Sequence, residues 1–300
     1  MTDSQSTTEI RPLDDRLAAC KAILTDLGRV VVAFSAGVDS TFLLALAVET
    51  LGTSNVLAAT GVSPSLPQRE LDEARKLAAK IGVEMVEIVT DEQDDPNYAA
   101  NPARRCFFCK SALFTRLTDL QRERGFSAVV SGANAADPGD FRPGLEAGRK
   151  LGVRNPLMEA GLTKADIRAA SRTRGLPTWD KPAMACLASR IPYGEAITPQ
   201  RLGRIEQAED YLKDLGFGQC RVRDHDTVAR IEVPPDNLVR LLHERAGIIE
   251  RFKSLGFTYI SLDLQGLRTG SMNEVLTSPS RDASNSQARL ELPCLDPPAA

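Results

Sequence analysis

The first half of the chain alternates between short apolar runs and longer segments in which apolar residues recur with a helical period. The runs lack regular polar alternation, as is typical of parallel strands buried on both faces of a sheet. They lie at 29–35, 55–61, 83–90 and 128–134, and the helical segments between them at 40–52, 67–82 and 110–125. Each of these helices ends at a glycine. The pattern predicts an α/β fold with a doubly wound parallel sheet, which binds ligands at the C-terminal ends of its strands.

The pattern changes after Thr198. A helix at 199–216 precedes two short strands at 220–225 and 228–233. A further helix at 236–255 and a strand at 259–264 follow. These elements predict a smaller α+β domain. Thr163 is the expected N-cap of another helix, and the Pro-rich stretch 176–200 fits no regular element, as is frequent in functional loops. We divide the chain into a disordered N-terminus (1–12), a larger α/β domain (13–198), the α+β domain (199–276) and a disordered tail (277–300).

Composition and charge exclude several classes of protein. The 300 residues carry 37 basic and 40 acidic side chains, a net charge of -3, which weighs against a dedicated nucleic-acid binder. The N-terminus has no apolar signal segment, and no apolar run approaches membrane-spanning length. We therefore expect a cytoplasmic protein with reduced cysteines and neither a nucleic acid nor a membrane as partner.

The first strand ends in the turn SAGVDS, residues 35–40, immediately before a helix. Such a junction exposes backbone N–H groups and the positive end of the helix to an anion such as phosphate. Ser35 and Ser40 add hydroxyl donors, and Gly37 allows close approach of the backbone. Asp39 would repel phosphate, so we expect it to bind Mg²⁺ or to cap the helix. The alternative is an N-capped helix without a ligand.

Three cysteines are candidates for chemistry. Cys106 and Cys109 form a C-x-x-C motif just before a helix, and Cys186 lies in the irregular stretch. Three thiolates suit an iron–sulfur cluster with one open iron, whereas a tetrahedral zinc site would normally use four ligands. A redox dithiol is a further alternative. We interpret the other thiols, Cys20, Cys220 and Cys294, as structural or incidental.

Several stretches together resemble the LarE family of ATP-dependent sulfur transferases, in the ATP-pyrophosphatase (PP-loop) superfamily. The resemblance rests on AFSAGVDSTFLL, RRCFFCKSALF, SGANAAD with DFRPG, GLPTWDKPAMACLASRIPYG, RVRDHDTVARIEV and GLRTGSMNEVL. It implies that 13–198 is a PP-loop domain and 199–276 binds substrate. The family adenylates carboxylates of pyridinium-3,5-biscarboxylic acid mononucleotide and converts them to thiocarboxylates, in nickel-pincer nucleotide cofactor biosynthesis. It also suggests a homo-oligomer such as a hexamer.

The resemblance implies two routes for sulfur. In family members that have only the cysteine matching Cys186, this residue gives up its own sulfur and becomes dehydroalanine. Members that also have the C-x-x-C motif bind a 4Fe-4S cluster through three cysteines, and the open iron carries sulfide. This chain has Cys106, Cys109 and Cys186, so we favour the cluster and keep the sacrificial route as the alternative. The source of sulfide stays open.

The resemblance also assigns roles to individual residues. The pyrophosphate loop is matched by Ser35, Gly37, Asp39 and Ser40, and the nucleotide site by Thr60, Gly132 and Asn134. Lys110 matches a lysine near the reacting groups. Asp137 matches an acidic position whose role is open. Ser189 and Arg190 are expected to position substrate or ATP phosphates. Arg221, Arg223 and Arg268 match a site for the mononucleotide phosphate, and Glu209 and Glu232 would orient these arginines or bind a divalent ion.

Other functions remain as alternatives. A tRNA thiolase of the same superfamily would bind RNA, but the chain has no basic appendage or zinc ribbon. An amide-forming ligase such as an NAD or GMP synthetase would not need the cysteines. A redox or metal sensor would bind a cluster without cleaving ATP.

Overall fold

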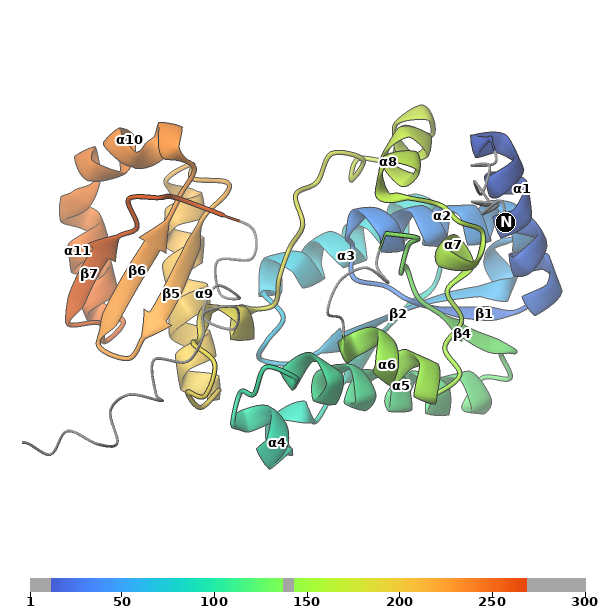
Figure 1. Cartoon of the computed structure of the whole chain (residues 1–300), viewed down its shortest axis with the longest axis horizontal. Helices are drawn as coiled ribbons and strands as arrows, with labels where there is room; N and C mark the ends of the chain where they lie inside the picture. The colour runs from blue at the N-terminus through green and yellow to red at the C-terminus, as the bar shows by residue number, and fades with distance from the viewer. Residues whose placement is uncertain (1–11, 137–142, 269–300) are drawn as a thin grey trace, which may run out of the picture. The chain divides into compact units, whose positions relative to one another are not determined.

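The larger sheet has four parallel strands in the order β3-β2-β1-β4, and Figure 1 labels β2, β1 and β4. The computed structural model describes residues 12–136 and 143–268. The strands are β1 (Val30–Ala33), β2 (Val56–Val62), β3 (Met85–Val89) and β4 (Ala128–Val130). Val30 of the central strand β1 pairs in register with Val56 on one side and with Ala128 on the other. The predicted α/β fold with a parallel sheet is confirmed.

Helices cover both faces of this sheet because successive strand residues point to opposite sides. Val30 and Val32 pack against one group of helices, whereas Val31 packs against the other. The first group is α1 (Leu13–Leu27), α2 (Val38–Leu51), α3 (Gln68–Ile81) and α8 (Lys164–Thr173), and the second is α5 (Arg105–Glu123) and α6 (Pro143–Lys150) (Figure 1). Burial of both faces explains why the strand sequences are almost continuously apolar.

The start of α8 forms as the sequence predicts. The Thr163 hydroxyl accepts a hydrogen bond from the Asp166 N–H, and the Asp166 carboxylate accepts one from the Thr163 N–H, which makes a capping box. Arg16 of α1 donates to both oxygens of Asp166, at 2.5 and 2.9 Å. The cap therefore also ties α8 to α1.

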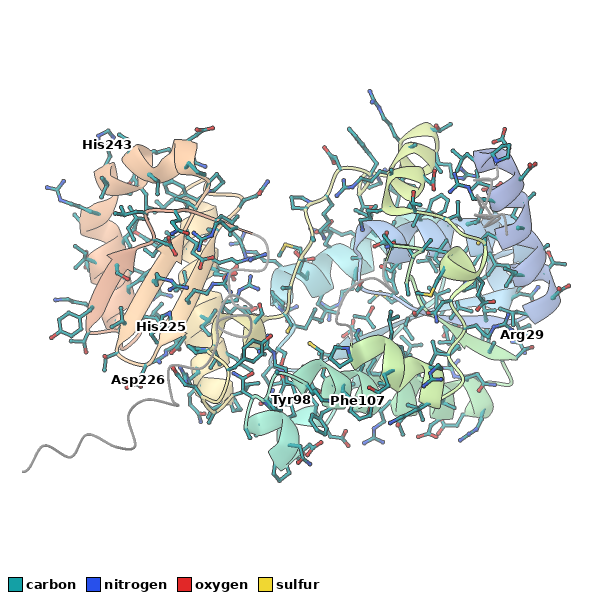
Figure 2. All side chains as sticks on the ribbon, in the orientation of Figure 1. Arg29, Tyr98, Phe107, His225, Asp226 and His243 are labelled. Carbon is teal, nitrogen blue, oxygen red and sulfur yellow. The ribbon has the colours of Figure 1, made fainter. Side chains whose placement is uncertain are left out.

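Short elements connect the larger ones: α4 (Pro96–Ala99), α7 (Pro156–Glu159), and the 3₁₀ turns η1 (Thr53–Asn55), η2 (Glu92–Asp94) and η4 (Leu187–Arg190). Tyr98 of α4 is fully buried in an apolar cluster with Leu187 and Ile205, and Figure 2 labels its side chain. The partly buried Phe108 and Cys109 of α5 pack against the same cluster. These contacts join the C-x-x-C helix to the stretch that contains Cys186.

The smaller sheet has the order β5-β6-β7, with β5 (Arg221–His225) antiparallel to β6 (Val228–Glu232) and β7 (Tyr259–Leu262) parallel to it. It packs with α9 (Pro199–Asp214), α10 (Leu238–His243) and α11 (Arg245–Ser254). The single helix predicted at 236–255 is therefore wrong. The turn η5 (Pro235–Asn237) precedes α10, and α10 and α11 are separate helices that meet at Glu244.

The chain divides into two compact units, residues 1–267 and 268–300. The predicted boundary between 198 and 199 stays a prediction. The predictions of disorder at 1–12 and 277–300 fall almost entirely outside the described residues, as do the positions of Asp137 and Cys294. Within 12–136 and 143–268, none of the helices has the length and apolar character needed to cross a membrane.

Candidate active site

A cavity of about 560 Å³ lies at the C-terminal ends of β1, β2 and β4. This is the edge at which parallel α/β sheets bind their ligands. The lining includes the four predicted loop residues Ser35, Gly37, Asp39 and Ser40, together with Gly132, Cys106 and Lys110. The fold therefore brings seven predicted site residues from three separate stretches of sequence to one cavity.

Hydrogen bonds within the SAGVDS turn define its shape. The Ser40 hydroxyl oxygen accepts from the Ser35 N–H at 3.2 Å and lies 3.1 Å from the Ser35 hydroxyl oxygen. Ala36, and not Gly37, has left-handed backbone geometry, with φ of 53°, whereas Gly37 is extended, with φ of -81°. The left-handed position of this turn is thus taken by an alanine, at a cost of about 1–2 kcal/mol.

Asp39 lies in the first turn of α2, where its two carboxylate oxygens differ. Oδ2 accepts a hydrogen bond from Lys164 Nζ at 2.5 Å, and Oδ1 is buried without a hydrogen-bond partner among the described residues. The N-cap of α2 is Gly37, and no side chain caps the helix. A buried oxygen without a donor fits a Mg²⁺ ligand better than a cap. Sequence reasoning missed Lys164, because nothing in its local sequence links it to a residue 125 positions away.

The other predicted nucleotide residues differ in their placement. A Cβ atom at Gly132 would lie 2.9 Å from Ser40 N, so glycine is needed for the loop after β4 to pass the start of α2. The Thr60 hydroxyl donates to the Phe34 carbonyl at 2.8 Å, and the Asn134 side chain accepts from the Ala136 N–H. Thr60 and Asn134 are buried and do not belong to the described lining of the cavity.

Of the three candidate cysteines, Cys186 lies close enough to Cys106 and Cys109 for its charge to affect the pKa of each. Cys106 and Cys109 occupy the first turns of α5 on the same side of the helix, and the exposed Cys186 immediately precedes η4. Cys106 is also exposed, yet loss of solvent around its thiol, and then the charge of Cys186, raises its pKa. Burial raises the pKa of Cys109 to about 12, and the charge of Cys186 also raises it. By contrast, Cys20 and Cys220 are buried elsewhere, and burial raises the pKa of each to about 12.

The three thiols are donors of the kind that iron–sulfur clusters use. Over the two described ranges, no three His, Cys, Asp or Glu side chains are close enough to hold one metal ion, so the structure by itself shows no metal site. A four-iron cluster spreads its irons over a larger volume and needs each thiolate to reach a different iron. The cysteines are therefore compatible in kind and number with three-point attachment.

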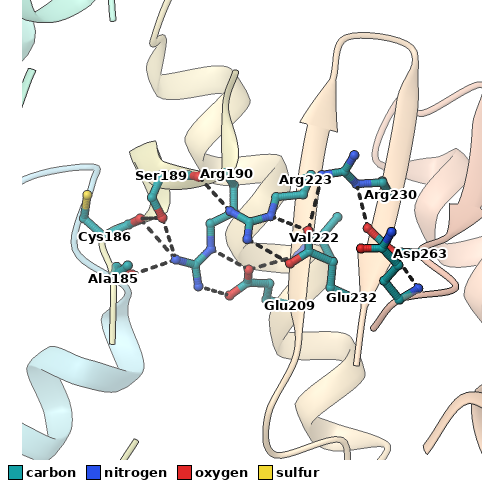
Figure 3. A network of polar contacts seen from close by, with 11 residues as sticks. Ala185, Cys186, Ser189, Arg190, Glu209, Val222, Arg223, Arg230, Glu232 and Asp263 are labelled. Carbon is teal, nitrogen blue, oxygen red and sulfur yellow. Dashed lines mark hydrogen bonds and ion pairs between the residues drawn. The ribbon is translucent and has the colours of Figure 1, made fainter. Parts of the chain in front are cut away.

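Four predicted site residues form two buried ion pairs, which Figure 3 shows from close by. Arg190 donates from Nε and Nη2 to the two carboxylate oxygens of Glu209, at 2.8 and 3.0 Å, and both side chains are at most 2% exposed. Arg223 donates to both oxygens of Glu232 at 2.8 Å. Glu232 thus orients Arg223, one of the three arginines expected at the phosphate site, whereas Glu209 pairs with Arg190, which was not among those three.

The same arginines hold the backbone around Cys186. Arg190 Nη1 donates to the carbonyl oxygens of Ala185 and Cys186, at 2.7 and 3.2 Å, and to the Ser189 hydroxyl at 3.0 Å (Figure 3). Arg223 Nη1 donates to the Ser189 carbonyl at 2.8 Å. These contacts support the turn after the cysteine, and neither arginine belongs to the described lining of the cavity.

Arg221 has a different environment from Arg223. It is half-buried, and burial followed by the positive charges of Arg223 and Arg190 lowers its pKa. A guanidinium group in a positive surrounding is stabilised by a nearby anion. Arg268 is the first residue of the second compact unit. Its predicted role stays a prediction, and Asp137 lies outside the described residues.

A parallel sheet whose first strand ends in an S-x-G-x-D-S turn, at the mouth of a ligand-sized cavity, defines an enzyme of the ATP-pyrophosphatase class. The NAD synthase family model matches residues 21–99, which contain this turn. An uncharacterized protein of Synechocystis sp. is 42% identical over 267 residues, which cover 88% of this chain and 99% of that protein. An uncharacterized protein of Methanocaldococcus jannaschii is 28% identical over 241 residues, or 80% and 91% of the two chains.

The pyridinium-3,5-bisthiocarboxylic acid mononucleotide synthase of Lactiplantibacillus plantarum is 38% identical over 265 residues, which cover 88% of this chain and 96% of that enzyme. The chain belongs to the family of this synthase, the LarE family. It is an ATP-dependent sulfurtransferase.

Proposed function

We propose that this enzyme activates the carboxylates of pyridinium-3,5-biscarboxylic acid mononucleotide with ATP and converts them to thiocarboxylates, in nickel-pincer nucleotide cofactor biosynthesis. Support comes from similarity to the synthase of Lactiplantibacillus plantarum over nearly the whole of both chains. The observation that carries the proposal is the meeting of the SAGVDS turn and Cys106 at one cavity. Activation and sulfur delivery need that proximity, because an acyl adenylate in water would hydrolyse.

The first step makes the carboxylate electrophilic. A carboxylate oxygen attacks the α-phosphorus of ATP, the bond to the β-phosphate bridging oxygen breaks, and pyrophosphate leaves. The hydroxyls of Ser35 and Ser40 and the N–H groups at the start of α2 would hold the pyrophosphate. Asp39 would hold Mg²⁺ through Oδ1, which has no hydrogen-bond partner in the described part of the chain, and Mg²⁺ offsets phosphate charge. Lys110, which lines the cavity, would stabilise negative charge on the reacting groups.

In the second step a sulfur nucleophile attacks the acyl carbon and AMP leaves. We propose that Cys106, Cys109 and Cys186 hold a 4Fe-4S cluster, which when bound supplies an open iron that carries sulfide. The alternative uses Cys186 itself. Its thiolate attacks the acyl carbon and AMP leaves, then loss of the Cα proton breaks the Cβ–S bond, which leaves dehydroalanine in the chain and the thiocarboxylate as product.

We further propose that Arg221 binds the phosphate of the mononucleotide. Its surroundings are positive because Arg223 and Arg190 lie nearby, and a positive surrounding favours an anion. Arg221→Gln should therefore weaken binding of the mononucleotide and leave ATP binding unchanged. Homo-oligomeric assembly stays a prediction.

Iron and acid-labile sulfide content of protein purified without oxygen tests the cluster. We expect about four irons per chain, loss of iron in Cys106→Ala, and retention in the control Cys220→Ala, whose buried thiol lies 3.7 Å from the Glu209 carbonyl. Mass spectrometry after turnover tests the alternative. Loss of one H₂S from the peptide that contains Cys186, with no iron in the wild type, would refute the cluster and support the sacrificial route. Absence of ATP- and mononucleotide-dependent pyrophosphate release would refute the proposed reaction.

A further inference from the structure

Lys181 lies in the irregular stretch between α8 and η4, five residues before Cys186, and its ammonium group joins three parts of the fold. Nζ donates to Glu70 Oε2 and Glu73 Oε2 of α3, at 2.8 Å each, and to the carbonyl oxygen of Ala36 at 3.2 Å. The side chain is only 13% exposed. Ala36 is the left-handed residue of the SAGVDS turn. One lysine thus connects the nucleotide turn to the segment that leads to the cysteine.

The backbone at this position is fixed from a second direction. Arg168 of α8 donates to the carbonyl oxygens of Trp179 and Lys181, at 2.9 Å each. Beyond the cysteine, the Leu187 N–H donates to the Ser65 carbonyl at 2.9 Å. Residues 182–186 therefore span two anchors.

The segment between these two anchors, residues 182–186, reaches the nucleotide cavity and includes Cys186. Met184 lines the nucleotide cavity together with Cys106, and Cys186 ends the span. No helix or strand hydrogen bonds stabilise residues 182–186. Because the span lacks this support, its position depends on the side chains that hold it. Arg190 holds the carbonyls of Ala185 and Cys186, and Lys181 is the anchor that touches the nucleotide turn.

We propose that Lys181 is a positioning residue that couples the nucleotide turn to the segment 182–186 and so to Cys186. A shift of the turn when ATP binds would move the Ala36 carbonyl, and its bond to Lys181 would transmit the shift to the span. The inference rests on the proposed function for its catalytic meaning. It does not depend on whether sulfur comes from a cluster or from Cys186.

Hydrogen–deuterium exchange of the full-length protein, with and without a non-hydrolysable ATP analogue and Mg²⁺, tests the coupling directly. In the wild type we expect the analogue to change exchange rates in the peptide 183–190 about fivefold or more. In Lys181→Gln the analogue should still bind, but the change in this peptide should fall below about twofold. Lys76→Gln, an exposed lysine of α3, is the control and should behave like the wild type.

Unchanged exchange in the wild type, or an equal change in Lys181→Gln, would overturn the coupling. Loss of analogue binding in Lys181→Gln would overturn it as well, because it would assign Lys181 to the nucleotide site itself. If that variant does not fold, Glu73→Gln removes one partner of Lys181 and Lys181→Arg keeps the charge. We then expect a reduced response in the first and a restored response in the second, and an unaltered response in Glu73→Gln would refute the coupling.

Turnover supplies a second readout that a purely structural role would not move. With the mononucleotide present, we expect Lys181→Gln still to release pyrophosphate from ATP. For each pyrophosphate released, it should form at least about tenfold less thiocarboxylate than the wild type. An unchanged ratio would contradict the inference. If the wild type itself forms no thiocarboxylate, the proposed function fails, and the exchange experiment still decides the coupling.

Discussion

The buried pair of Arg190 and Glu209 gives the sharpest test of how the Cys186 segment is held. We consider Glu209→Gln, which keeps the size of the side chain and removes its charge. An amide oxygen in place of Oε1 would still accept from Arg190 Nε and from the Val222 N–H, now at 2.8 and 3.1 Å. The amide NH₂ in place of Oε2 would face Arg190 Nη2, now at 3.0 Å, donor against donor.

The magnitude follows from this geometry and from burial. Arg190 is 2% exposed, so water cannot replace the lost carboxylate. Removing one partner of a buried ion pair costs about 3–5 kcal/mol. Because glutamine keeps one acceptor, we expect the lower end, about 3 kcal/mol. With a dependence on urea of about 2–3 kcal/mol per molar, the midpoint of unfolding should fall by about 1–1.5 M.

Urea unfolding followed by circular dichroism measures this shift. Glu250→Gln, an exposed residue of α11, is the matched control and should change the free energy of unfolding by less than about 0.5 kcal/mol. A loss below about 1 kcal/mol in Glu209→Gln would mean that the charge of Glu209 does not stabilise Arg190 as the buried geometry requires.

Three further predictions concern other parts of the fold. Gly132→Ala should weaken ATP binding at least tenfold by calorimetry, because the added methyl would lie 2.9 Å from the backbone nitrogen of Ser40. Gly203→Ala, with no atom within 4 Å of the added methyl, should bind ATP normally. Asn101 is buried at φ of 52° and donates to two carbonyls of the segment after η4. Asn101→Ala should cost about 2–4 kcal/mol in urea unfolding, and Asn101→Gly less, since glycine tolerates the backbone angle. Burial, then the charge of Arg230, lowers the pKa of His225 below 6.5. Its contribution to stability is therefore complete above that pH and falls as the pH drops through the lowered pKa, so His225→Gln should lose less stability than the wild type between pH 7 and pH 5.

Local sequence determined the main elements of this protein. The strands could be read from the sequence because burial on both faces leaves a continuous apolar run, and the start of α8 because Thr163 and Asp166 cap each other within one turn. The SAGVDS turn and the C-x-x-C motif stood out because their chemistry depends on residues close together in the chain. The break between α10 and α11 did not, since the sequence around Glu244 contains no proline or glycine within two residues.

Only the tertiary structure decided which distant side chains meet. Resemblance identified Arg190, Arg223, Glu209 and Glu232 as site residues. The pairing of Arg190 with Glu209 depends on how η4 packs against α9, and that of Arg223 with Glu232 on the register of β5 against β6. Lys164 and Lys181 carried no local signal, although one binds Asp39 and the other the Ala36 carbonyl. A charged group that is removed from water must find a partner wherever the fold offers one, and that partner has no fixed distance in the sequence.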